Sequence, residues 1–423
     1  MRLGAGYRII QSVLIMMRKH PMYYMKSKPL AVALMLSCCL AATAQASTKQ
    51  LDLVEKQRFE MDDFVTFAGK TIKHVQVGWE SYGELNAAKD NVILITHYFS
   101  ATSHAAGKYA QDDPEAGYWD AIIGPGKAID TNQYFVISVD TLVNLNANDP
   151  HVITTGPASI NPDTGKPYAM DFPVVTIRDF VNVQKAVLES LGISKLHAVI
   201  GASMGSMQAI DWAATYPDWV PRMISVIGSG QSDAWTTSLL EQWAIPIRLD
   251  VNWQQGDYYN DSPPTAGLTA ALMFITQDAL TPAFFIATGQ QAEVNHSPLE
   301  AGPLNDIRQN YSIINWLHER AASRVKFMDA NHLLYLVRAN QLFVAGYKQD
   351  LRTGLANLRA KTLFLPSNND LLLMPYLARD AFEILKKQGK DTQYKELDGD
   401  LGHLNGVSNI SGQTQKITDF LAH

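Results

Sequence analysis

The chain has only two cysteines among its 423 residues, and both of them, Cys38 and Cys39, lie close to its N-terminus. Residues 47–423 contain no thiol, so that part of the chain excludes disulfide bonds, zinc sites built on cysteine and a cysteine nucleophile. The N-terminal segment itself lacks a hydrophobic run long enough to span a membrane. The apolar stretch at residues 30–44 is shorter than the about 20 residues that a membrane-spanning helix needs.

The first 46 residues have the composition of an export signal. They carry six basic residues and no acidic residue, continue into the apolar stretch and end in Ala44-Gln45-Ala46. A basic region, an apolar core and small residues before a cleavage site are typical of a secretory signal peptide. If the chain starts at Met25, the segment also has the usual length of such a signal. We expect residues 1–46 to be a signal peptide cleaved after Ala46, and the mature protein to be periplasmic or secreted. A membrane anchor and a lipoprotein signal at Cys38 are the alternatives.

Removing this leader makes the chain distinctly acidic. Lysine plus arginine falls from 35 to 29 while aspartate plus glutamate stays at 41, so the formal net charge changes from −6 to −12. An acidic surface disfavours nucleic acid and anionic membranes as partners. We therefore expect no nucleic-acid partner and no membrane insertion after cleavage. The sequence has no phosphate-loop or metal-ligand spacing, so we also expect no cofactor and no metal.

Short apolar runs alternate with helical patterns in residues 47–231 and again in 347–423. The expected strands are Val75–Tyr82, Asn91–Thr96, Tyr134–Val139, Leu196–Ile200, Met223–Ile227, Thr362–Leu365 and Tyr394–Leu397. Continuous apolar runs are typical of central parallel strands, so the pattern predicts a mostly parallel sheet with helices on both faces. Residues 232–346 are instead helical in pattern and rich in aromatics. We expect them to form a helical lid inserted between the first part of the core, 47–231, and the second, 347–423.

A strand and a helix flank the segment Gly201-Ala202-Ser203-Met204-Gly205. The expected strand ends at Ile200, and a helical pattern runs from Ser206 to Tyr216. A serine on such a sharp turn is exposed above the sheet, and the glycines let strand and helix approach each other. The helix N-terminus favours developing negative charge. The segment therefore indicates a nucleophilic serine of the α/β-hydrolase fold, with a structural glycine turn as the alternative.

A serine hydroxyl needs a histidine to accept its proton and a carboxylate to orient that histidine. In the α/β-hydrolase fold the three follow the order serine, acid, histidine along the chain. His403 lies in the loop after the last expected strand, and Asp370 follows the strand before it. We therefore predict a triad of Ser203, Asp370 and His403. Asp398 and Asp400 are rival acids, although both are close in sequence to the histidine.

Several longer motifs resemble those of the homoserine O-acetyltransferase family of α/β-hydrolase-fold enzymes. The matching segments are Glu80–Asn86, His97–His104, Gly124–Thr131, Thr155–Pro157, Ser159–Pro162, Gly165–Tyr168 and Ser203–Ala209. The resemblance covers most of the mature chain and implies the same triad. It also implies an oxyanion hole made by the backbone N–H groups of Phe99 and Met204, and an acyl-serine intermediate. A homodimer formed through the lid is a further implication.

The chain departs from this family at the groups that bind the amino acid. The family uses an arginine in the first lid helix for the carboxylate and an aspartate after the catalytic histidine for the ammonium. This chain has Ala244 and Leu404 at those positions, with Arg248 as the nearest arginine. A glycine-rich loop of the family is replaced by Asn144–Ile153. Burying a zwitterion without ionic partners is costly, so these departures argue against homoserine as the substrate.

The expected compartment leads to the same conclusion, because an exported enzyme does not normally meet acetyl-CoA. We therefore expect an exported ester hydrolase or O-acyltransferase that acts on an uncharged small-molecule ester through an acyl-serine. One alternative is homoserine acetyl transfer from acetyl-CoA, which an uncleaved leader and a cytoplasmic location would favour. The other is a non-catalytic binding protein on a hydrolase scaffold.

Overall fold

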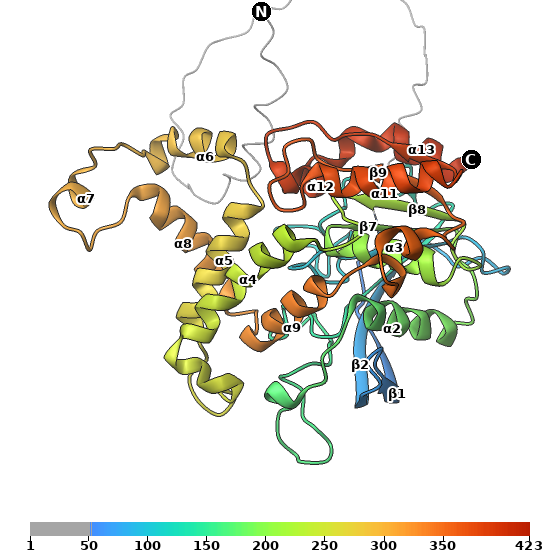
Figure 1. Ribbon diagram of the computed structural model, residues 1–423, viewed down its shortest axis with the longest axis horizontal. Helices are drawn as coiled ribbons and strands as arrows, with labels where there is room; N and C mark the ends of the chain where they lie inside the picture. Colours follow the sequence, from blue (N-terminus) through green and yellow to red (C-terminus); the bar gives the residue numbers. More distant parts are fainter. Residues whose placement is uncertain (1–50, 52) are drawn as a thin grey trace, which may run out of the picture. The chain divides into compact units, whose positions relative to one another are not determined.

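The computed structural model describes residue 51 and residues 53–423 (Figure 1). The expected signal peptide, its cleavage site and both cysteines lie outside the described residues. In the part of the chain that is described, no single helix is long and apolar enough to cross a membrane.

An eight-stranded sheet with the order β1-β2-β6-β3-β7-β8-β9-β10 forms the centre of the fold. β1 pairs antiparallel with β2, and β2 with β6, whereas all the other neighbours in this sheet are parallel. The strands are β1 (Gln57–Val65), β2 (Thr71–Tyr82), β3 (Val92–Thr96), β6 (Phe135–Val139), β7 (Ala198–Ala202), β8 (Arg222–Val226), β9 (Lys361–Leu365) and β10 (Thr392–Tyr394). The short strands β4 (Ile123–Gly124) and β5 (Ile129–Asp130) form a separate pair. The sheet is mostly parallel, as the sequence predicts.

Both faces of the sheet are buried beneath helices and loops. The covering helices are α2 (Ile177–Ser190), α3 (Met204–Thr215), α10 (Leu351–Leu355), α11 (Pro375–Lys387), α12 (Asn405–Ser408) and α13 (Thr414–Ala422). Successive side chains of a strand point to opposite faces. Leu94 of β3 accordingly packs in the cluster that contains α2, α3 and α11, whereas Ile93 and Ile95 pack in the cluster that contains α13. Burial on both faces is the reason for the continuous apolar runs in these strands.

Several strands differ from the prediction, most clearly at the two edges of the sheet. β1 was not expected, and its partner β2 begins at Thr71 rather than Val75. The last strand, expected at Tyr394–Leu397, is β10 at Thr392–Tyr394. It ends early because the neighbouring β9 is followed by Pro366, which has no N–H to continue the ladder. Beyond Tyr394 the two segments share only isolated hydrogen bonds, such as that from the Leu397 N–H to the Pro366 carbonyl at 2.8 Å.

Between β8 and β9 the chain leaves the sheet and forms mainly helices. They are α4 (Ala234–Leu249), α5 (Thr265–Asp278), α6 (Pro282–Gly289), α7 (Ala301–Asn305), α8 (Ser312–Val325) and α9 (Ala330–Gln341). α4 packs against α5 and α9, and α5 packs against α8 (Figure 1). All six lie within residues 232–346, the segment expected to form the lid.

Candidate active site

Ser203 occupies a strained turn between β7 and α3. Its φ of 57° and ψ of −122° are values that residues other than glycine rarely adopt. A Cβ atom on Gly201 would lie 2.1 Å from the Gly205 carbonyl oxygen, and one on Gly205 would lie 1.9 Å from that of Thr96. The Thr96 hydroxyl also donates to the Gly205 carbonyl at 2.7 Å. Only glycine fits at these two positions, and the turn expected from the sequence is held between β3, β7 and α3.

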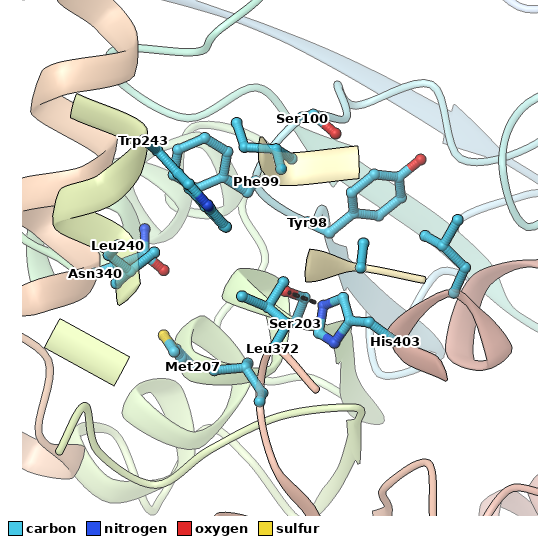
Figure 2. Close-up of a pocket in the computed structure, with 14 residues that line it drawn as sticks. Tyr98, Phe99, Ser100, Ser203, Met207, Leu240, Trp243, Asn340, Leu372 and His403 are labelled. Carbon is cyan, nitrogen blue, oxygen red and sulfur yellow. Dashed lines mark hydrogen bonds between the residues drawn. The ribbon is translucent and has the colours of Figure 1, made fainter. Parts of the chain in front are cut away.

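The structure brings Ser203, His403 and Asp370 together. His403 Nε2 lies 2.8 Å from Ser203 Oγ (Figure 2). The Nδ1 atom of His403 lies 2.7 Å from Asp370 Oδ2. All three residues are buried, although they come from turns that follow three different strands, β7, β9 and β10. The carboxyl ends of parallel strands share one edge of the sheet, and this explains how residues so distant in sequence meet.

The other oxygen of Asp370 is held by the backbone. Asp370 Oδ1 accepts hydrogen bonds from the N–H groups of Leu372 at 2.9 Å and Leu373 at 3.0 Å. These bonds fix the carboxylate and leave its second oxygen for His403. The acid is therefore both buried and oriented.

The loop that carries His403 is held by Asn405, a residue that sequence reasoning missed. Its Nδ2 donates to the Gly399 carbonyl at 3.1 Å, and so ties the start of the loop to its end. The rival acids Asp398 and Asp400 lie on this loop with exposed side chains. The described hydrogen bonds of His403 include neither of them. A single asparagine two residues after a histidine is too common a pattern to have given a signal.

Phe99 and Met204 keep free backbone donors beside Ser203. Phe99 lies in the loop after β3 and lines the same pocket as Ser203, whereas Met204 is the first residue of α3. Among the described hydrogen bonds, none uses either N–H group as a donor to a protein acceptor. Met204 is free because the first N–H groups of a helix have no intrahelical partner. Both residues expected to form an oxyanion hole therefore have an N–H group available there.

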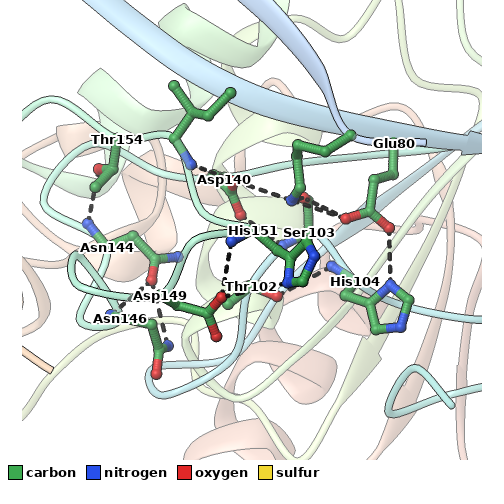
Figure 3. Close-up of polar contacts among 12 residues, drawn as sticks. Glu80, Thr102, Ser103, His104, Asp140, Asn144, Asn146, Asp149, His151 and Thr154 are labelled. Carbon is green, nitrogen blue, oxygen red and sulfur yellow. Dashed lines mark hydrogen bonds and ion pairs between the residues drawn. The ribbon is translucent and has the colours of Figure 1, made fainter. Parts of the chain in front are cut away.

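Buried charges hold the end of the loop that carries Phe99 (Figure 3). Lys56 Nζ lies 2.7 Å from Glu80 Oε1 and 3.2 Å from Asp140 Oδ2. Asp140 Oδ1 accepts the N–H of Ser103 at 2.7 Å, and the second oxygen of Glu80 lies beside the loop's last histidine. One buried ammonium therefore pairs with two buried carboxylates, and buried charges need such partners.

Two asparagines hold the same loop from its other side. Asn146 Nδ2 donates to the Ser100 carbonyl at 3.1 Å, and Asn144 Nδ2 donates to the Ala101 carbonyl at 3.1 Å. The two are joined because Asn144 Oδ1 accepts the Asn146 N–H at 2.9 Å. Both belong to the segment 144–153, which replaces the family's glycine-rich loop. The segment in which this chain differs from the family therefore contacts the loop that carries Phe99.

Ser203 and His403 open into a pocket with mostly apolar walls. Its lining residues are Tyr98, Phe99, Ser100, Ser203, Met207, Leu240, Trp243, Ile275, Ala279, Asn340, Leu372, Leu373, His403 and Leu404. None of these described lining residues is an aspartate, glutamate, lysine or arginine. Arg248 is not among them and instead pairs with Glu241 on the exposed surface of α4. Apart from His403, none of these lining residues has an acidic or basic side chain that could pair with the charges of a zwitterion. In the described part of the chain, no group of three His, Cys, Asp or Glu residues is arranged to hold a metal ion.

Comparisons with known proteins identify the fold and the relatives. Residues 118–406 match the family model described as the alpha/beta hydrolase fold, which confirms the predicted fold class. The homoserine O-acetyltransferase of Methanohalobium evestigatum is 35% identical over 89% of this chain and 75% of its own length. That of Deferribacter desulfuricans is 34% identical over 85% of this chain and 93% of its own length.

Two solved structures resemble the chain over most of its length. Esterase E22 is 67% identical, with a TM-score of 0.86 over 87% of this chain and 100% of that one. The homoserine O-acetyltransferase from Bacillus anthracis is 40% identical, with a TM-score of 0.84 over 88% of this chain and 98% of that one. Both an esterase and an acetyltransferase are thus among the relatives.

The buried charges at Lys56 predict a loss of stability in acid. Burial raises the pKa of Glu80, but the hydrogen bond with His104 and the charge of Lys56 outweigh it and lower that pKa from 4.5 to about 2. Ionised Glu80 therefore stabilises the fold fully above about pH 4.5, and this contribution is lost as the pH falls towards 2. We expect the wild type to lose roughly 3 kcal/mol more unfolding free energy over this range than Glu80→Gln does.

Urea unfolding between pH 7 and pH 2.5 measures this difference. Glu60→Gln is the matched control, since Glu60 lies half-exposed on the edge strand, 3.5 Å from Arg58. A Glu80→Gln variant whose stability falls with acid as steeply as that of the control would contradict the assignment.

Proposed function

Because the chain belongs to the homoserine O-acetyltransferase family of α/β-hydrolase-fold enzymes, we propose that it is an exported ester hydrolase or O-acyltransferase with Ser203 as its nucleophile. One observation carries the proposal. Asp370, His403 and Ser203 form a continuous series of hydrogen bonds at the wall of a pocket without acidic or basic side chains other than the histidine. Membership of an enzyme family makes a non-catalytic binding protein the less favoured alternative.

The first half of the reaction forms an acyl-serine. Ser203 Oγ attacks the ester carbonyl carbon while His403 Nε2 takes the hydroxyl proton. Asp370 accepts the Nδ1–H of His403, which fixes the tautomer and stabilises the imidazolium as it forms. The N–H groups of Phe99 and Met204 stabilise the negative charge on the carbonyl oxygen, each contributing a few kcal/mol. Collapse of this intermediate breaks the ester C–O bond, and His403 gives its proton to the departing alcohol.

The second half returns Ser203 to its free form. Water or an alcohol attacks the acyl carbon, and His403 removes the proton of the attacking hydroxyl. The C–O bond to Ser203 then breaks, and the proton passes from His403 to Ser203 Oγ. Water yields a carboxylic acid, whereas an alcohol yields a new ester, so a single site supports both hydrolysis and transfer.

The walls of the pocket favour a neutral substrate. Leu404 lines the pocket next to His403, and Ala244 is fully buried in α4, so neither position supplies the charge found in the family. A zwitterion entering this site would lose its hydration without gaining ion pairs. A neutral ester avoids that cost and gains contact with the apolar side chains.

Homoserine acetyl transfer from acetyl-CoA is the second candidate. It is favoured by the names of the relatives, which include homoserine O-acetyltransferases at 34–40% identity. It requires another residue to replace the missing arginine and aspartate. Arg248 is poorly suited, since it pairs with Glu241 outside the pocket.

The proposed nucleophile is tested by covalent labelling. A fluorophosphonate probe should modify Ser203 in the wild type and leave Ser203→Ala unmodified. Replacing His403 or Asp370 by alanine should lower kcat/KM by roughly a thousandfold or more, because the proton acceptor or its orientation is lost. Ser206→Ala is the control, since Ser206 lies on the same helix but bonds to Ser225 Oγ at 2.6 Å. Mass spectrometry that finds equal labelling of Ser203→Ala would refute the assignment.

Export is tested at the N-terminus of the native protein. The basic and apolar regions of residues 1–46 should direct the chain out of the cytoplasm, and the mature protein should begin at Ser47. Cell fractionation followed by N-terminal sequencing measures both. Material from the cytoplasm that starts at Met1 or Met25 would remove the compartment argument and restore acetyl-CoA as a donor.

The substrate class is tested with two reactions. The enzyme should hydrolyse p-nitrophenyl acetate but transfer no acetyl group from acetyl-CoA to L-homoserine, because the pocket has no ionic partners for the amino acid. The absorbance of released p-nitrophenol measures ester hydrolysis. A thiol-reactive dye measures the coenzyme A that acetyl transfer releases. Faster acetyl transfer than ester hydrolysis would show that another residue anchors homoserine and would favour the second candidate.

A further inference from the structure

Asn340 places a polar group in the apolar side of the pocket. It is the penultimate residue of α9 and only 4% exposed, yet it lines the pocket that contains Ser203. Figure 2 shows it beside Leu240, on the side of the pocket that also holds Trp243 and Met207. An amide at this position is surrounded mainly by hydrocarbon.

The helix fixes the orientation of this amide. Asn340 Nδ2 donates to the Leu336 carbonyl at 2.8 Å, one turn earlier in α9. The reversed amide would bring two oxygens, both acceptors only, to that distance. The NH₂ group therefore faces the helix, and Oδ1 is left to face the pocket.

Oδ1 has no partner among the described residues. Ser232 Oγ donates to the backbone carbonyl of Asn340 at 2.7 Å, not to its side chain. The nearby indole N–H of Trp243 is also engaged, since it donates to Asp278 Oδ2 at 2.8 Å. Oδ1 is an acceptor on the pocket wall that is open to water. A substrate that displaces this water must supply a donor, because an acceptor left without a partner is costly.

We propose that Asn340 is a specificity-determining residue whose Oδ1 accepts a hydrogen bond from a hydroxyl or N–H group of the ester substrate. The inference rests on the proposed function, because it takes this pocket as the substrate site. A substrate that carries the donor satisfies Oδ1, whereas an analogue with a methyl group in its place leaves Oδ1 unpaired and is rejected. The preferred esters are thus neutral but hydroxylated or amide-bearing.

The donor can belong to either half of the ester, so the experiment has two arms. In the acyl arm, methyl glycolate is compared with methyl propanoate, and methyl 3-hydroxypropanoate with methyl butanoate. In the alcohol arm, 2-hydroxyethyl acetate is compared with propyl acetate, and 3-hydroxypropyl acetate with butyl acetate. Each ratio of kcat/KM is divided by the same ratio for hydrolysis by hydroxide, which removes intrinsic reactivity.

We expect the wild type to favour the hydroxylated member of at least one pair by about tenfold or more, and Asn340→Leu to lose that preference. Gln341→Leu is the matched control, because the neighbouring Gln341 bonds outside the pocket to the Thr237 carbonyl at 3.2 Å and should keep the ratio. The arm that responds identifies the half of the ester that Asn340 binds.

Two outcomes would overturn the inference while leaving the proposed function in place. One is a wild type that hydrolyses these esters with no preference in any pair. This result is decisive without any variant, because it is measured on the wild type alone. The other is an Asn340→Leu enzyme, folded by circular dichroism, with the same ratios as the wild type. Failure of the proposed function is different, since no ester in either arm would then be hydrolysed and Ser203 would not react with a fluorophosphonate.

Discussion

The close approach of α3 to strands β3 and β7 is the constraint on which the site depends. It is possible only because residues 201 and 205 have no side chain, and it forces Ser203 into a backbone conformation that is costly by roughly 1–3 kcal/mol. The surrounding contacts supply this free energy. The strain turns the hydroxyl out of the sheet towards His403, so the backbone rather than the side chain decides where the nucleophile lies.

Support for the site comes from groups distributed over the whole chain. Backbone N–H groups orient Asp370, an asparagine closes the loop of His403, and buried charges together with two asparagines hold the loop of Phe99. Each of these partners is fixed by other contacts. A reaction centre that does not rearrange when charge develops needs such surroundings, because reorientation of dipoles would otherwise raise the barrier.

Sequence reasoning succeeded where local pattern and fold order coincide. The turn at Ser203 and the order of serine, acid and histidine led to the three residues that the structure brings together. Edge strand β1 escaped notice because most of its residues are exposed and three are acidic, so it has neither an apolar run nor clear alternation. The partners of Lys56 were equally hidden, since Glu80 and Asp140 are far from it in sequence. An asparagine near a helix end, such as Asn340, is usually solvated, so only its burial reveals it.

The helical insertion between β8 and β9 has a consequence for the order in which the fold is completed. β9 pairs with β8, yet segment 227–360 separates them. During synthesis the N-terminal part of the chain is made first, so one edge of β8 stays unpaired until the whole insertion and β9 have been made. Such an open apolar edge is a template for pairing with other chains. Early organisation of α4 to α9 would shorten that interval, and the local contacts of helices form faster than the distant pairing of strands.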